Sequence, residues 1–143
     1  MDSKCILSLA LMSLCFAFAV KAEAATVYVN HDGSGDFTTI QAAINAAVSG
    51  TVIIVEAGVY AEHISFTGKA ITLQSADPLD PDTVANTVIN GTENGTCISF
   101  SNGEGPDSVL QGLTIRNGFA TEGGGVYCLG ASPTISDCVF RDN

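Results

Sequence analysis

Residues 109–117 read VLQGLTIRN, and residues 134–142 read TISDCVFRD. The two stretches match position by position at a constant offset of 25 residues. Leu110 then aligns with Ile135, Ile115 with Phe140, and Arg116 with Arg141. A fixed offset of roughly 20–30 residues between matching strands is typical of a solenoid, in which each repeat forms one coil. Residues 51–143 would form about 3.7 such coils.

Short apolar runs, separated by clusters of Gly, Asn, Asp and Ser, continue this pattern over the rest of the chain after Gly50. The runs cover 52–55, 64–66, 71–73, 87–90, 97–100, 110–115, 126–129 and 135–140. We expect three short strands per coil, on three faces of a prism, with parallel pairing between coils about 4.8 Å apart. Strands near 52–55, 71–73, 113–115 and 138–140 should stack, and Ile115 and Phe140 should both point inward.

One helix is expected ahead of the coils. Thr38 and Gln41 form a capping box, and Gly50 ends the helical pattern. The apolar face of the expected helix holds Ile40, Ala43, Ile44, Ala47 and Val48. A helix over 39–48 would therefore plug the N-terminal end of the coils, burying Ile40, Ile44 and Val48. The segment 77–82, DPLDPD, should leave the sheet as a loop because proline lacks a backbone donor.

The first 24 residues have the pattern of a cleaved signal peptide, with Lys4, an apolar run over 6–20 and the exit Ala22-Glu23-Ala24. The run is shorter than the roughly 20 residues of a membrane span. We expect a signal peptide over 1–24, a strand and capping helix over 25–50, and β-helix coils over 51–143. These coils are expected to be truncated at the C-terminus, so that further coils or a partner would cover that end. Secretion or display at the cell surface would follow.

The charge of the chain excludes two classes of partner. Residues 25–143 hold 13 acidic side chains and the bases Lys69, Arg116 and Arg141, a net charge of −10. Nucleic acids and anionic membranes repel such a surface. Three cysteines remain after cleavage, Cys97, Cys128 and Cys138. Buried thiols and a Cys128–Cys138 disulfide are both open interpretations.

Two sets of motifs carry a resemblance to known families. The stretch DGSGDFTTIQAAI over 32–44, followed by TVIIVEAGVY over 51–60, closely resembles the opening of pectinesterase and pectate-lyase-like right-handed parallel β-helices. The stretches GGGVY at 123–127 and FRDN at 140–143 resemble the GGA and FxxN elements of polymorphic outer-membrane-protein repeats. The resemblance implies an all-β fold, a right-handed parallel β-helix with an N-terminal capping helix. It also implies a function that involves polysaccharides.

The resemblance does not imply a reaction. Pectinesterases of the family use two aspartates and a glutamine on later coils, pectate lyases use calcium-holding aspartates with an arginine, and hydrolases use an aspartate cluster. None of these motifs is recognisable here, so no catalytic, cofactor or metal residue is assigned, and no cofactor is expected.

Several polar residues still have a functional interpretation beside a structural one. Asp77, Asp80 and Asp82 could bind calcium, although a solvated acidic loop is favoured. Arg116 and Arg141 should be vertical neighbours that contact acidic sugars or, as we favour, form surface salt bridges with Asp137 or Asp142. His63 could act as a base but has no nucleophile nearby, and His31 is expected to be exposed in a turn. The glycine-rich loop over 32–36 could suggest a phosphate site, but its two aspartates would repel phosphate. Asn90 and Asn94 begin glycosylation sequons.

Two functions from different classes remain. The first is a secreted or surface β-helix module, structural or binding, that contacts an extracellular polysaccharide or a surface protein. The alternative is the N-terminal part of a polysaccharide-degrading enzyme of the pectate-lyase or pectinesterase type. The absence of a recognisable catalytic motif favours the module, and the opening motif favours the enzyme.

Overall fold

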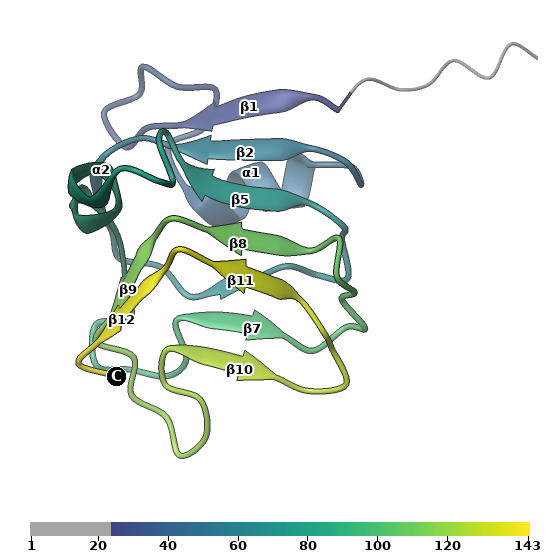
Figure 1. Cartoon of the computed structure of the whole chain (residues 1–143), viewed down its shortest axis with the longest axis vertical. Coiled ribbons are helices and arrows are strands. Elements are labelled where there is room, and N and C mark those ends of the chain that lie inside the picture. Colours follow the sequence, from purple (N-terminus) through teal and green to yellow (C-terminus); the bar gives the residue numbers. More distant parts are fainter. Residues whose placement is uncertain (1–23) are drawn as a thin grey trace, which may run out of the picture.

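Three parallel sheets form the faces of a β-helix in the computed structural model, which describes residues 24–143. The first sheet stacks five strands, one from each successive coil, as Figure 1 shows. They are β1 (Thr26–Val29), β2 (Val52–Val55), β5 (Thr72–Ser75), β8 (Val109–Gln111) and β11 (Thr134–Ser136). Every neighbouring pair in this sheet is parallel, which confirms the β-helix fold expected from the repeat.

The second and third sheets complete each coil. The four-stranded sheet contains β3 (Gly58–Tyr60), β6 (Thr87–Asn90), β9 (Thr114–Arg116) and β12 (Val139–Arg141). The three-stranded sheet contains β4 (Ile64–Ser65), β7 (Ile98–Phe100) and β10 (Val126–Cys128). Phe140 pairs with Ile115 and Arg141 with Arg116, so the 25-residue offset is the true spacing between these coils.

The expected stack of four strands is wrong in one respect, because those strands lie on two different faces. β2 and β5 belong to the five-stranded sheet, whereas β9 and β12 belong to the four-stranded sheet. The runs 110–115 and 135–140 each turn a corner halfway, at Gly112 and Asp137, whose φ angles are 62° and 54°. The corners of the two coils lie one above the other, since Gly112 N donates to Ser136 O at 3.1 Å.

Inward side chains form one apolar column inside each face. Ile53, Leu73 and Leu110 lie in register in the first sheet and are fully buried. Between the coils Phe66 and Phe100 stack with ring centroids 4.4 Å apart. Parallel in-register stacking thus turns a repeated apolar position into a continuous core.

The capping helix α1 (Ile40–Ala46) packs against β1, β2 and β4. Ile40 and Ile44 are fully buried, as expected, but Val48 lies beyond the helix and is 68% exposed. The expected capping box is also wrong, because Thr39, not Thr38, is the N-cap. The helix ends before Ala47, where Lys69 Nζ donates to the carbonyl oxygens of Ile44 and Asn45 at 2.7 and 2.8 Å.

Side chains of the first coil fix α1 at both ends. The two carboxylate oxygens of Glu62 accept from the backbone N–H groups of Ile40 and Gln41, each at 2.9 Å. The amide of Gln41 in turn pairs with both backbone groups of Ser65, at 2.8 and 3.1 Å. Since β4 is the edge strand of its sheet, this side chain satisfies backbone groups that a neighbouring strand would otherwise pair.

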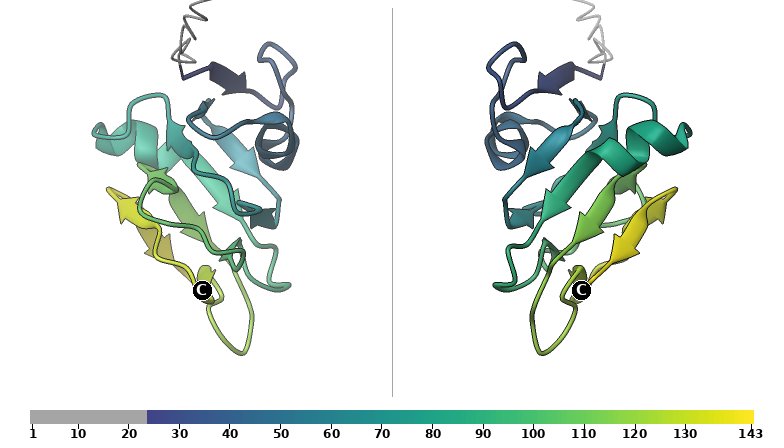
Figure 2. Two further views of the ribbon diagram at one scale, coloured as in Figure 1. Left: turned by 90° about the vertical axis from the view of Figure 1, so that its right-hand side faces the viewer. Right: turned by 90° about the vertical axis from the view of Figure 1, so that its left-hand side faces the viewer.

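The proline-rich segment leaves the sheets, as predicted, but it forms a second helix instead of a loop. Helix α2 (Pro81–Asn86) has Asp80 as its N-cap and Pro81 at its first position. Figure 2 shows α2 on the outside of the stack. Thr114 Oγ1 donates to Val84 O at 2.8 Å and joins the helix to the outer face of the four-stranded sheet.

The cysteines do not form a disulfide among the described residues. Cys97 is buried, Cys138 is half-buried and Cys128 is exposed, so the buried-thiol interpretation holds for Cys97 only. Burial raises the pKa of the Cys97 and Cys138 thiols, which makes both less reactive.

Candidate functional site

The corner between the four-stranded and three-stranded sheets combines polar, charged and aromatic side chains from successive coils. Asn117 and Asp142 follow β9 and β12, and each has a φ of 56°. Asn117 N donates to Asp142 O at 3.0 Å, so the corners of these two coils are stacked. Asn and Asp tolerate the left-handed conformation better than most residues, which explains their place at this turn.

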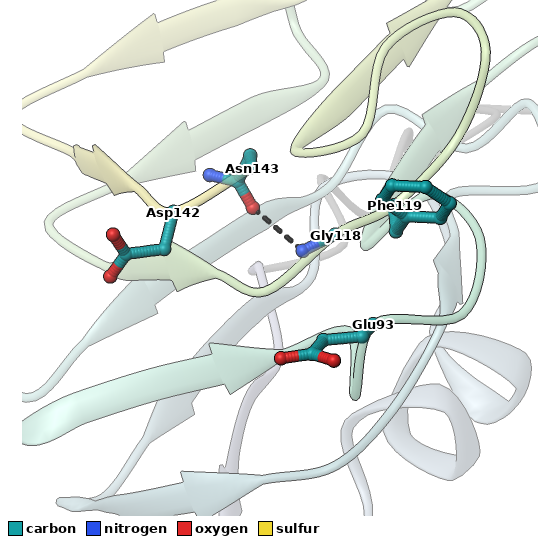
Figure 3. Close-up of a pocket in the computed structure, with 5 residues that line it drawn as sticks. All are labelled: Glu93, Gly118, Phe119, Asp142 and Asn143. Atoms are coloured by element: carbon teal, nitrogen blue, oxygen red, sulfur yellow. Dashed lines mark hydrogen bonds between the residues drawn. The ribbon is translucent and has the colours of Figure 1, made fainter.

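Asn143 joins the same two coils through its side chain. Its Nδ2 donates to Ile115 O at 3.0 Å, and its Oδ1 accepts from Gly118 N at 2.9 Å, as Figure 3 shows. Gly118 and Gly124 are in such close contact that a Cβ on Gly118 would clash with the carbonyl oxygen of Gly124. The FxxN element and the glycine run therefore act together, because the glycines leave room for the asparagine between coils.

A hollow of about 460 Å³ opens at this corner, lined by Glu93, Gly118, Phe119, Asp142 and Asn143 (Figure 3). Phe119 is 75% exposed. Two backbone hydrogen bonds between Phe119 and Gly95, at 2.7 and 2.8 Å, hold the loop that carries the ring. Glu93 N donates to Asn117 O at 2.8 Å and anchors the opposite wall. An exposed aromatic ring that lines the same hollow as two carboxylates can stack on a sugar while the carboxylates accept from other hydroxyl groups of the saccharide.

An arginine column lies on β9 and β12, immediately before this corner. Arg116 and Arg141 are in register, and Asn90 precedes them on β6 in the same column. The expected salt bridges do not form: no carboxylate of residues 24–143 lies within 4.0 Å of either guanidinium. Asp137 instead accepts from Gln111 Nε2 at 3.0 Å. Arg116 Nε is buried and has no hydrogen-bond partner in the described part of the chain.

The acidic segment before α2 has a structural role. The Asp80 carboxylate accepts from the hydroxyl and the backbone N–H of Thr83, at 2.6 and 2.9 Å. These two bonds lower the pKa of Asp80. Asp77 accepts from Leu79 N at 3.3 Å, and Asp82 lies in the first turn of the helix. Within residues 24–143 no group of three His, Cys, Asp or Glu side chains is arranged to hold a metal ion.

The two histidines make different contacts. His63 Nδ1 lies 2.8 Å from Thr96 O and links two coils. His31 packs edge-on against Tyr60, with ring centroids 5.7 Å apart. Burial raises the pKa of Tyr60, whose hydroxyl lies 2.9 Å from Glu56 O. Neither histidine lines the hollow at the corner.

The glycine-rich loop over 32–36 is closed by its own hydrogen bonds. Ser34 N donates to Asp32 Oδ1, and Tyr28 N donates to Asp36 Oδ2, both at 2.8 Å. Bonds from Ser34 lower the pKa of Asp32. Of the two sequon asparagines, Asn94 is exposed in a turn. Asn90 Oδ1 accepts from Thr92 N and from Asn117 Nδ2.

A second hollow, of about 340 Å³, lies between α2 and the last coil. It is mostly apolar and is lined by Pro78, Leu79, Pro81, Val84, Asp137, Cys138 and Val139. One carboxylate and no base line it. This composition gives it less capacity for polar recognition than the corner hollow.

Sequence reasoning did not find Glu93 and Phe119. They come from loops that follow β6 and β9, and only the stacking of coils brings them together with Asp142. A single phenylalanine inside the polar stretch 116–124 was the available signal. Glu62 and Glu104 were also missed, because their hydrogen-bond partners are backbone groups that the sequence does not reveal.

No family model matches the chain. A curated relative, the "Probable pectinesterase/pectinesterase inhibitor 17" of Arabidopsis thaliana, is 35% identical over an alignment of 98 residues that covers 62% of this chain and 18% of the relative. Among solved structures, "Pectin methylesterase from Carrot" matches with a TM-score of 0.58 and 22% identity, over 78% of this chain and 38% of the other.

This chain has the pectinesterase-like parallel β-helix fold. The resemblance seen in the opening motif is thereby confirmed at the level of fold. The chain spans less than a fifth of the curated relative and less than half of the solved pectinesterase-like chain.

The structure bears on the membrane-spanning helices but not on the predicted signal peptide. The signal-peptide interpretation falls on residues that lie outside the described part of the chain, apart from Ala24. Among residues 24–143 the helices are too short and too polar to cross a bilayer.

Proposed function

We propose that this chain is part of a secreted, non-catalytic β-helix module that binds a polysaccharide at the corner hollow. The observation that carries the proposal is that the exposed Phe119 ring lines the same hollow as Glu93 and Asp142. Aromatic stacking supplies affinity for the flat face of a sugar, and the carboxylates accept from its hydroxyl groups.

The charge of the hollow favours an uncharged sugar. Glu93 and Asp142 are both acidic, and the chain carries a net charge of −10. A sugar carboxylate at the hollow would be repelled, whereas a neutral or esterified sugar would not. Methyl-esterified pectin is therefore the first ligand to test, because the two relatives are named for esterases that act on pectin.

A pectinesterase-type enzyme is the second candidate, and both comparisons favour it. The chain spans 18% of the curated relative. Most of the relative's length therefore has no counterpart in this chain. We expect the 143-residue chain by itself to release no methanol from pectin, with or without calcium.

Affinity electrophoresis of the full chain in gels containing highly esterified pectin, with xylan gels as a comparison, tests the binding proposal. Phe119→Ala should weaken retardation at least about tenfold, because it removes the stacking surface. Leu79→Ala is the matched control, since Leu79 is equally exposed but lies near the other hollow. Equal retardation of both variants would contradict the proposal.

Methanol release assayed on the same samples separates the two functions. Methanol release by the parent chain that disappears in Glu93→Gln or Asp142→Asn would contradict the binding module and support an esterase. Binding without turnover supports the module.

A further inference from the structure

We propose that Arg116 and Arg141 form a site for an oxyanion, distinct from the sugar hollow. The two guanidiniums project from the same outward column of the four-stranded sheet, on strands paired in register. Paired strands lie about 4.8 Å apart, so the backbones of the two arginines are close neighbours. Like charges directly opposite each other on a sheet are destabilising unless something neutralises them.

Nothing in the described chain neutralises this pair. Asp142 is adjacent to Arg141 in the sequence, and Asp137 is bonded to Gln111. Neither comes within 4.0 Å of a guanidinium, although the chain has far more acids than bases. The only other described base, Lys69, is bonded to the C-terminus of α1. Two adjacent unpaired arginines are thus exceptional in this acidic molecule.

A second observation points to a ligand. Arg116 Nε is buried and has no partner. A buried donor of a charged group is costly when unpaired, so native structures normally satisfy it with protein, water or an ion. An oxyanion that contacts the guanidinium of Arg116 would compensate this charged group and bridge the two side chains.

The column has the right donors for an oxyanion. Each guanidinium presents a planar fork of N–H groups that matches a carboxylate, sulfate or phosphate. Asn90, the next residue in the column, has its Oδ1 occupied by Thr92 N and Asn117 Nδ2. Its amide nitrogen therefore adds a donor, not an acceptor, on this side of the sheet. The shared chemistry is an oxyanion, carried by a sugar or free in solution.

The experiment uses the two Arg Nε–Hε signals in the ¹⁵N–¹H NMR spectrum of the full chain, which contains only these two arginines. Single Arg→Gln variants assign the signals. Separate titrations use an oligogalacturonate, a sulfated oligosaccharide, inorganic sulfate and a neutral oligosaccharide. We expect the two signals to move together with an oxyanion, with one common binding curve, and to stay unmoved with the neutral sugar.

Arg141→Gln should weaken the binding reported by Arg116 Nε about tenfold. Gln74→Glu is the control for overall charge, because it lowers the net charge by the same one unit at an outward position of a different sheet; it should change the affinity less than about twofold. A response to sulfated or uronic sugars at concentrations where inorganic sulfate gives none assigns the anion to a sugar, and an equal response assigns it to a free ion.

Immobile Nε signals in all four titrations would overturn the proposal, as would equal weakening by Arg141→Gln and Gln74→Glu. The sugar hollow is tested separately through Phe119, so either proposal can fail without the other.

Discussion

The hydroxyl groups of Ser75 and Ser108 are both buried, but only one is hydrogen-bonded. Ser75 Oγ has no partner, whereas Ser108 Oγ donates to Lys69 O at 3.0 Å. We expect Ser75→Ala to raise the free energy of unfolding by up to about 1 kcal/mol, because it removes a buried unpaired polar group. Ser108→Ala should lower it by about 1 kcal/mol or slightly more. Urea unfolding of both variants measures the difference, and shifts of the same sign would contradict this account.

At the scale of elements, two apolar residues in and just after α1 differ in burial. Ile44 is fully buried against the first coil, and Val48 lies outside the helix in solvent. Ile44→Asp should cost about 3 kcal/mol, because it places a charge in an apolar contact. Val48→Asp introduces the same charge at an exposed site and should stay within about 0.5 kcal/mol. Thermal melts of the two variants test whether α1 seals the core, and an unchanged melt of Ile44→Asp would show that it does not.

The loop between β7 and β8 depends on the buried carboxylate of Glu104. Burial by itself would raise the pKa of Glu104, but hydrogen bonds from the backbone N–H groups of Asn102 and Gly68, both at 2.9 Å, more than offset it and lower the pKa. A carboxyl whose pKa is lowered in the folded state stabilises the fold above its unfolded pKa. That contribution disappears as the pH falls through the folded pKa.

Acid unfolding therefore provides a test of Glu104. We expect the parent chain to lose stability below about pH 4.5 more steeply than Glu104→Gln, which cannot titrate at this position. Glu93→Gln, at an exposed position, serves as the control. Parallel pH profiles for the parent chain and Glu104→Gln, measured by thermal melts between pH 3 and 7, would show that the contact contributes nothing.

In the whole molecule, each coil is stabilised only by its neighbouring coils. The protection of backbone amides from hydrogen exchange should therefore depend on the position of a strand in the stack. β5 and β8 are paired on both sides, whereas β1 and β11 end the order of their sheet in the described structure. Amide hydrogen exchange of the full chain should be slowest in β5, β6, β8 and β9 and faster in β1. Uniform exchange across all strands would instead indicate a single cooperative unit with no gradient between coils.

The register of the coils could be predicted from the sequence, but the corners between strands and the end of α1 could not. The register of β9 with β12 follows from matching residues at a constant offset, so Ile115 and Phe140 could be paired in advance. The corners at Gly112 and Asp137 could not, because apolar residues continue on both sides of each bend. The end of α1 depends on Lys69, which lies 24 residues or more away from the carbonyls that it caps.

The candidate site was less predictable than the fold. The arginine column follows from the repeat, and its register is confirmed. The hollow could not be foreseen, because Glu93, Phe119 and Asp142 belong to three different turns of the chain and, being 26 and 23 residues apart, share no constant offset. Local patterns specify strands and helices, whereas a site of this kind depends on how loops of unequal length meet at one corner.

The outward excursion over 76–86, between β5 and β6, separates the length of a coil from the register of its strands. β5 pairs with β2 and β8, and β6 pairs with β3 and β9, without a shift, although α2 is inserted between them. Evolution can therefore lengthen this corner without disturbing the core, and a protein engineer can do the same. A peptide tag or a foreign recognition loop placed between Leu79 and Asp80, ahead of the N-cap of α2, would be displayed on a scaffold whose strands need not move.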